Sequence, residues 1–131
     1  MSYGAKVAEF QSQIAQYPVP SELLRELPAN WAPSLQAMIN EELDETLLAA
    51  ETNDMVEVAD GLADLLYFIV GQAVRVGIDI DAVFDEVHRS NMTKKSGPKP
   101  GRPVALPYDC YKDADYSAPD LATVLGGSNA S

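Results

Sequence analysis

Apolar residues recur along this chain with the spacing of helices rather than with the alternation of strands. Residues 2–17 carry an apolar residue every three or four positions, which predicts a first helix. Residues 18–28 are bounded by prolines and predict only a short helical turn. Two longer helices are predicted over about 33–52 and 55–76, and a fourth over 82–95.

The third predicted helix has the most apolar composition. From Gly61 to Val74 its only charged residue is Asp64. Because a helix that is apolar on most sides is buried on most sides, we expect it to be the central helix. Asp54 can cap its first turn, and Gly77 is a typical signal for its end.

The remainder of the chain lacks a helical period. Residues 98–125 are rich in proline and predict an ordered arm, with a short last helix over 118–125. Residues 126–131 are small and polar and predict a flexible tail. With a helical core over about 32–97, the 131 residues predict a single domain.

Composition narrows the class of protein. No stretch is long and apolar enough for a transmembrane helix, and no basic region followed by an apolar run marks a signal peptide. Cys110 is the only cysteine, so we expect a reducing cytosol. The net charge of -11 argues against binding to nucleic acid polymers or to anionic membranes.

The acidic residues are concentrated in the two long helices. In the stretch "NEELDETLLAAE", residues 40–51, Glu42 lies in the middle of the apolar side. Glu45 lies at the edge of that side, and Glu41 precedes Glu42. A carboxylate in the stripe that should face the core requires an explanation, because an unpaired buried charge costs several kcal/mol.

The third helix repeats this arrangement. Glu57, Asp60 and Asp64 are spaced by three and four residues, so they share one face. The turn between the two helices is very short, which predicts an antiparallel hairpin with six carboxylates in one interhelical space. Carboxylate oxygens without a His or Cys pattern suit Mg²⁺, with Mn²⁺ as a substitute.

A solvated acidic surface is the alternative. It is the better interpretation for Asp44, Glu51 and Asp54, whereas Glu42, Glu45 and Asp64 lie among apolar residues and favour a metal site. The evidence for Glu41, Glu57 and Asp60 is intermediate.

The motifs "EELDE" and "GLADLLYFIVGQAVRVGIDIDAVFDEVHRSNMTKKSG" resemble the all-α nucleoside triphosphate pyrophosphohydrolases. These include MazG proteins, phosphoribosyl-ATP pyrophosphohydrolase and the dimeric dUTPases. The similarity covers residues 34–97 and is greatest to small MazG-like members. It implies an all-α bundle of four to five helices that forms a homodimer or a homotetramer. It also implies Mg²⁺-dependent hydrolysis of a nucleoside triphosphate to a monophosphate and pyrophosphate.

The family motif is EExxE followed by ExxD. Glu41, Glu42 and Glu45 match the first part and Asp64 matches the last residue, but the first Glu of ExxD falls on Gly61. We expect Asp60 to replace it, with Glu57 as the alternative, and the missing side chain of Gly61 to leave room for a metal or its water. Glu42, Glu45, Asp60 and Asp64 are then the predicted metal ligands, and Glu41 or Glu42 the general base.

Basic residues near the end of the fourth helix are candidates for phosphate contacts. Asn91 and Lys94 match the family pattern "HRxNxxK", and Arg89 and Lys95 lie beside them. The alternative for Arg89 and Lys95 is that they only complement the helix C-terminus. The lone His88 more often has a packing role than a catalytic one.

The sequence leaves the substrate open among dGTP or GTP, dUTP, dCTP and modified nucleotides. The resemblance implies the cytosol of a bacterial cell or of a phage-infected host, and a role in histidine synthesis is disfavoured because the tail differs. Since Gly61 departs from the motif, a non-catalytic acidic binding protein with a degenerate metal site is the second hypothesis.

Overall fold

The computed structural model describes residues 1–104 and 106–126, in two compact units, Met1–Asp81 and Ala82–Ser131. Its secondary structure is almost entirely helical, which confirms the predicted all-α class. The units divide within a helix, after residue 81. The elements are α1 (Tyr3–Gln13), α2 (Trp31–Glu51), α3 (Met55–Val74), α4 (Ile80–Asn91), β1 (Lys95–Ser96), β2 (Cys110–Tyr111) and α5 (Leu121–Val124).

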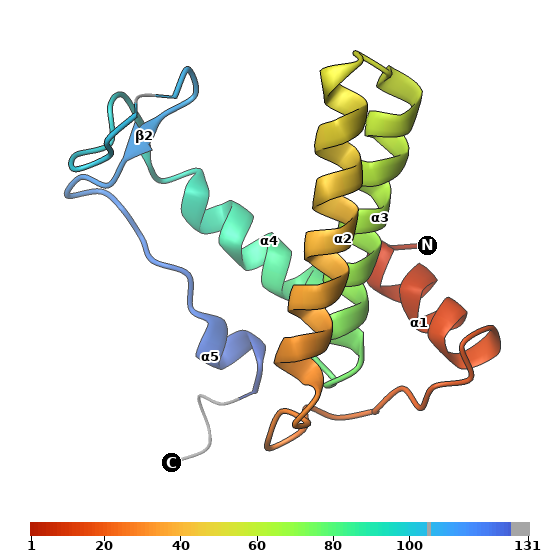
Figure 1. Ribbon diagram of the computed structural model, residues 1–131. Helices are drawn as coiled ribbons and strands as arrows, with labels where there is room; N and C mark the ends of the chain where they lie inside the picture. Colours follow the sequence, from red (N-terminus) through yellow and green to blue (C-terminus); the bar gives the residue numbers. More distant parts are fainter. Residues whose placement is uncertain (105, 127–131) are drawn as a thin grey trace. The chain divides into compact units, whose positions relative to one another are not determined.

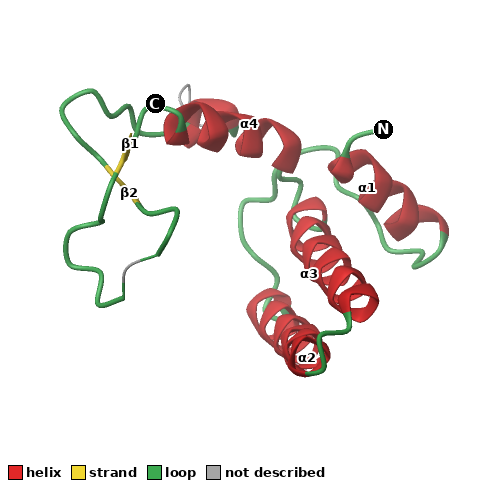
Figure 2. Cartoon of the chain, turned by 90° about the horizontal axis from the view of Figure 1, so that it is seen from above, coloured by secondary structure: helices red, strands yellow, loops and turns green. Residues whose placement is uncertain are grey.

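The first unit is organised around a helical hairpin. Helices α2 and α3 run side by side and are joined by a short turn, while α1 packs on another side of α3 (Figures 1 and 2). In the turn, Asn53 has a φ of 57°, and the Asp54 carboxylate accepts a hydrogen bond from the Glu57 amide at 3.2 Å. The predicted cap of α3 is therefore present, and the position of Asp54 determines where α3 begins.

The core lies at the open end of this hairpin. Val7 of α1 packs against Val70 and Val74 of α3, and all three are buried. Trp31 and Gln72 tie α2 to α3 by two reciprocal hydrogen bonds. The indole Nε1 donates to the backbone carbonyl of Gln72 (2.9 Å), and the side-chain Nε2 of Gln72 donates to the backbone carbonyl of Trp31 (2.8 Å).

The prediction that α3 is buried on most sides is wrong for the half of the helix near the turn. Val70 to Val74 are buried, but Leu62 is 56% exposed and Leu66 is 41% exposed. Only α1 and α2 pack on α3 within this unit, and α1 reaches only part of its length. The apolar surface of α3 is thus larger than these neighbours can cover.

The predicted helical turn in residues 18–28 is also wrong, because these residues form bends without a helix. Prolines at both ends fix φ and remove backbone donors. The segment is held instead by a hydrogen bond from the Leu24 amide to the Val76 carbonyl at 2.9 Å. Beside it, Gly77 has a φ of 79°, and a Cβ there would collide with the Glu22 carbonyl, so this position requires glycine.

The second unit contains most of α4, the two-stranded antiparallel sheet β1–β2 and the short helix α5. The strands pair Lys95 with Tyr111 and Ser96 with Cys110. The predicted last helix over 118–125 is confirmed as α5. Except for Gly126, the tail predicted to be flexible lies outside the described residues. In the part of the chain that the structure covers, no helix is long and apolar enough to cross a membrane.

Candidate functional site

The first candidate group lies on α2, where the side chains of the EExxE motif differ in exposure. Glu42 is half-buried, whereas Glu41 and Glu45 are exposed. One turn further, Thr46 is buried at 7% exposure, and its hydroxyl donates to the Glu42 carbonyl at 2.7 Å. The apolar stripe predicted from sequence therefore does face α3, and Glu42 lies on it.

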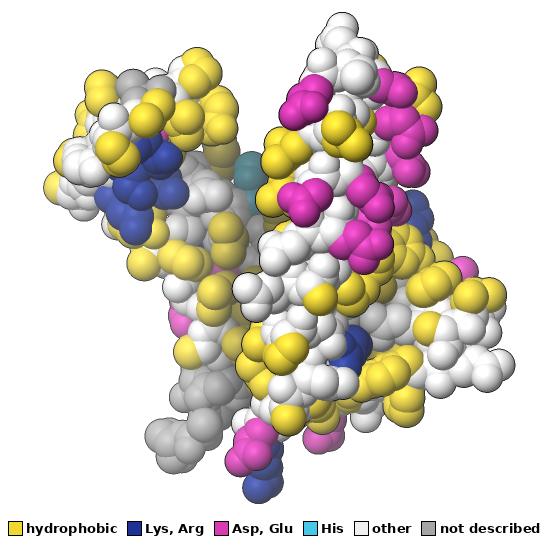
Figure 3. All heavy atoms as spheres, viewed as in Figure 1, with side chains coloured by type: hydrophobic (Ala, Val, Ile, Leu, Met, Phe, Trp, Pro, Cys, Tyr) yellow, Lys and Arg dark blue, Asp and Glu magenta, His cyan; other side chains and the backbone are white. Residues whose placement is uncertain are grey.

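The second group lies on α3. Asp64 is half-buried, and Asp60 and Glu57 are exposed. Acidic side chains gather on the surface of the α2–α3 hairpin in Figure 3, with few basic side chains among them. None of the ion pairs within the described residues involves a carboxylate of α2 or α3.

The electrostatics of Glu42 show which carboxylates the fold brings together. Burial raises the pKa of the Glu42 carboxyl, and the negative charges of Glu45, Asp64, Glu41 and Asp60 raise it further. The hairpin thus couples both parts of the motif across the two helices. Glu57 is absent from the groups that act on Glu42.

The carboxylates do not form a closed metal site as they stand. Within residues 1–104 and 106–126, no three Asp, Glu, His or Cys side chains lie close enough together to hold an ion. Their chemistry nevertheless fits a divalent cation, because oxygen donors from two facing helices repel one another without a counter-charge. The residues that could hold such an ion are Glu42, Glu45, Asp60 and Asp64.

Gly61 does not leave the space that the sequence suggested. It is buried, and a Cβ built on it would collide with the Thr46 hydroxyl and lie 3.0 Å from the Thr46 Cβ. The expectation of room for a metal or water at Gly61 is therefore wrong. Glycine at this position instead allows α2 and α3 to approach closely at Thr46. Sequence reasoning missed this contact because it depends on the register between two helices.

An apolar cavity of about 200 Å³ is lined by residues of α1, α2 and α3. Met38 and Phe68 line it, one helical turn from Glu42 and Asp64 respectively. Two of its lining residues have a buried polar atom without a hydrogen-bond partner among the described residues, Oε1 of Gln11 and Nε of Arg75. Its other lining residues include Phe10, Tyr17 and Tyr67. The sequence gives no signal for Gln11, since it is a single polar residue within a helix.

The basic candidates lie in the second unit and differ in how they are engaged. The Arg89 guanidinium donates to both Glu86 oxygens (2.6 and 3.0 Å), to the Ser117 hydroxyl (3.1 Å) and to the Ala118 carbonyl (3.0 Å). Lys95 forms a long, exposed ion pair with Asp115 at 3.8 Å.

Asn91 and Lys94 stand at and just beyond the end of α4. The Asn91 side chain is exposed, and the Lys94 amide donates to the Asn91 carbonyl at 3.1 Å. Neither side chain has a carboxylate partner within the described residues. Of the four basic and polar candidates, these two are therefore the ones whose functional groups are available to a ligand.

Comparison with known protein families identifies a match. The family model of phosphoribosyl-ATP pyrophosphohydrolase matches residues 7–91, well over half of the chain. The matched part contains every acidic candidate and ends at Asn91, before Lys94. A search of curated proteins finds no match. The chain therefore belongs to the phosphoribosyl-ATP pyrophosphohydrolase family, a family of nucleotide pyrophosphohydrolases within the MazG-like superfamily.

Proposed function

We propose that the protein hydrolyses a ribo- or deoxyribonucleoside triphosphate to the monophosphate and pyrophosphate, and so controls the free nucleotide pool. The supporting observation is the raised pKa of Glu42, which lies among four other carboxylates of α2 and α3. The family membership supplies the reaction class, and this cluster supplies acidic groups suited to it.

In this proposal Glu42, Glu45, Asp60 and Asp64 hold Mg²⁺, or Mn²⁺ in its place. The ion, when bound, polarises a phosphoryl oxygen and lowers the pKa of a coordinated water. Glu41 or Glu42 accepts the proton of the attacking water. Glu42 is better suited to this role in one respect, because a raised pKa makes a carboxylate a stronger base.

Asp60 is the preferred substitute for the family glutamate that is missing at Gly61. Its negative charge is one of those that raise the pKa of Glu42, and Glu57 is not among them. A matched set of variants tests this assignment. Asp60→Asn should lower turnover at least about 100-fold with little loss of fold, because removing one ligand charge weakens the metal site.

Glu57→Gln and Asp44→Asn are the controls for that variant, and both should retain activity. Loss of activity in Glu57→Gln with retention in Asp60→Asn would reverse the assignment. Retention in both would mean that Asp64 is the only ligand from α3.

The phosphates are contacted in this proposal by Asn91 and Lys94. Lys95 is a weaker candidate because of its ion pair with Asp115. The donors of Arg89 are used within its own unit, which favours a structural role over a substrate contact. The base would occupy the apolar cavity beside Met38 and Phe68, whose aromatic walls suit a flat ring.

The proposed assembly is a homodimer or a homotetramer. Helices α2 and α3 expose large apolar side chains that a second copy would cover, including Leu47, Leu48, Leu62 and Ile69. The proposed location is the cytosol of a bacterial cell or of a phage-infected host.

A pyrophosphate-release assay with the eight common ribo- and deoxyribonucleoside triphosphates tests the function and the base preference together. We expect activity with Mg²⁺, none with EDTA, and pyrophosphate plus monophosphate as the first products. Orthophosphate and a diphosphate as first products would exclude this reaction. A modified-nucleotide panel follows if the common nucleotides are poor substrates.

The competing proposal is a non-catalytic acidic binding protein. It rests on Gly61, which stands where the family motif has a glutamate. It predicts no turnover with any nucleotide, even when Mg²⁺ raises the melting temperature. Thermal stabilisation by Mg²⁺ together with turnover would exclude it.

A further inference from the structure

The segment between Lys94 and Lys112 has a charge opposite to that of the whole chain. It contains five Lys and Arg residues and a single acid, Asp109, in a protein of net charge -11. A basic cluster within an acidic chain is not explained by solubility, since either sign of charge would serve that purpose.

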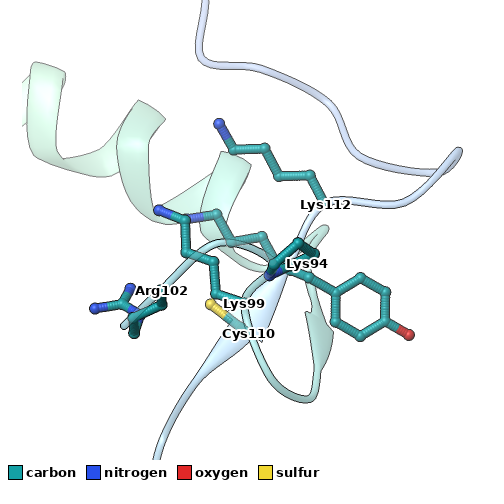
Figure 4. A pocket seen from close by; sticks show the side chains of 7 residues that line it. Lys94, Lys99, Arg102, Cys110 and Lys112 are labelled. Atoms are coloured by element: carbon teal, nitrogen blue, oxygen red, sulfur yellow. The ribbon is translucent and has the colours of Figure 1, made fainter. Parts of the chain in front are cut away.

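The β1–β2 hairpin brings these cations to one cavity. Pairing of Lys95 with Tyr111, together with a hydrogen bond from the Gly97 amide to the Asp109 carbonyl at 3.1 Å, places Lys94 and Lys112 at corresponding ends of the two strands. The cavity measures about 270 Å³, and we call it the hairpin pocket. Figure 4 shows that its lysine side chains extend toward one side of the hairpin. Its lining residues are Lys94, Lys99, Pro100, Arg102, Cys110, Tyr111 and Lys112.

The single acid of this segment pairs with one lining cation, Arg102, and leaves the three lysines without it. The Asp109 side chain is only 7% exposed and accepts from Arg102 Nε at 3.0 Å and from the Lys99 amide at 3.4 Å. It therefore holds the loop in place. Lys94 and Lys99 have no carboxylate partner within the described residues, and Lys112 lies over the Tyr116 ring at 4.8 Å.

We propose that the hairpin pocket binds an oligophosphate, either free pyrophosphate or the phosphate tail of a nucleotide. Four cationic side chains and no carboxylate line it, so a ligand with several negative charges on adjacent phosphates fits it better than a single phosphate does. All of its lining residues lie beyond the matched residues 7–91. Because the pocket includes Lys94, the binding of a nucleotide tail there rests on the proposed function, whereas the binding of free pyrophosphate does not.

Isothermal titration of the full-length protein with sodium pyrophosphate, in EDTA and at constant ionic strength, tests the proposal. The double variant Lys99→Gln/Lys112→Gln should lose about tenfold or more in affinity, because hydrogen bonds to charged groups are strong. The control Lys6→Gln/Arg25→Gln removes two exposed cations from the first unit and should bind as the unmodified chain does.

Two further measurements identify the ligand and test the pocket in a protein that carries no substitution. A non-hydrolysable triphosphate analogue that binds when pyrophosphate does not would support the proposal with the nucleotide tail as ligand. In the unmodified protein, the bound ligand should also slow alkylation of Cys110, which is half-buried in the lining.

Absence of binding by both ligands overturns the proposal. Equal loss of affinity in the control variant also overturns it, because the attraction would then belong to the overall charge. Loss of turnover in Asp60→Asn with unchanged pyrophosphate binding would concern the proposed hydrolysis and leave the pocket intact.

Discussion

The ionised carboxylate of Glu42 is needed for the proposed activity but opposes folding. Its carboxyl lies on the face of α2 that packs on α3, and burial together with four neighbouring carboxylates raises its pKa above 4.5. The folded chain therefore binds a proton at this position more readily than the unfolded chain does. As the pH rises through the folded pKa, the ionised Glu42 opposes folding.

The unfavourable charge of Glu42 in the folded chain predicts the behaviour of Glu42→Gln. In EDTA above neutral pH, the variant should melt at a higher temperature than the unmodified protein, because the repelled charge is gone. Below the ordinary carboxyl pKa of 4.5 the difference should vanish, since both forms are then neutral. Thermal melts between acidic and mildly basic pH check the sign, and a less stable variant at high pH would contradict it.

The activity of the same variant should be abolished, because the proposed base and ligand are both lost. The matched control is Asp44→Asn, an acidic residue of α2 that is exposed and absent from the groups acting on Glu42. It should change neither the melting profile nor the turnover appreciably.

At the scale of elements, the contact between Thr46 and Gly61 sets how closely α2 and α3 approach. A side chain at position 61 has no free volume, since Thr46 occupies it. The family glutamate could be accommodated here only if the helices moved apart.

A double-mutant cycle tests this packing. Gly61→Ala should destabilise the protein by about 1–3 kcal/mol through overpacking, which outweighs the gain in helix propensity of at most about 1 kcal/mol. Thr46→Ala removes two of the three colliding atoms and should recover part of that loss in the double variant. Additive effects in urea unfolding would show that the two positions do not meet.

A second element-scale prediction concerns the anchor between α4 and the segment before α5. Glu86 accepts from Arg89 and from the Asp120 amide, and these hydrogen bonds lower its pKa to about 2. A lowered carboxyl pKa means that the anchor is fully present above pH 4.5 and is lost as the pH falls toward 2.

Glu86→Gln should therefore speed amide exchange at Asp120 near neutral pH, where the ionised carboxylate is the acceptor in the unmodified protein. The control is Asp115→Asn, which removes an exposed ion pair and should have little effect. Unchanged exchange in Glu86→Gln would mean that the anchor does not depend on charge.

The elements show what the sequence predicts well and where it fails. Helical period and an Asp54 cap placed α2 and α3 to within a few residues, and Glu42 was identified because it interrupts an apolar stripe. Residues 18–28 lack the predicted helical turn, because the prolines at their ends fix φ and remove backbone donors. The pairing of Lys95 with Tyr111 joins segments too short to have a period.

The sequence predicts which residues of the candidate site share a helical face, but it does not predict which residues of the two helices meet. Spacing alone places Asp60 and Asp64 on one side of α3, but the burial of Thr46 against Gly61 depends on interhelical register. The ion pair between Asp109 and Arg102 likewise depends on the conformation of a segment that has no hydrophobic period, so the sequence does not predict it.

At the scale of the whole molecule, the exposed apolar surface of α2 and α3 predicts self-association. Leu48 is 64% exposed and Leu62 is 56% exposed on helices that should bury such residues. We expect light scattering at micromolar concentration to give a dimer or a tetramer, and Leu48→Glu to shift it toward the monomer.

Ile14→Glu is the control for assembly, because Ile14 is 70% exposed but lies at the end of α1, outside the α2–α3 hairpin. Dissociation by Ile14→Glu alone would mean that a different surface is used. A fully active monomer would contradict the proposed assembly.

The reciprocal hydrogen bonds of Trp31 and Gln72 have a spectroscopic consequence. Trp31 is the only tryptophan of the chain, so the tryptophan fluorescence of the protein comes from one location, the open end of the α2–α3 hairpin. Its emission reports opening of that end, while far-ultraviolet circular dichroism reports loss of all the helices. Coincidence of the two unfolding curves would identify a single cooperative transition, and an earlier change in emission would show that the hairpin opens before its helices melt.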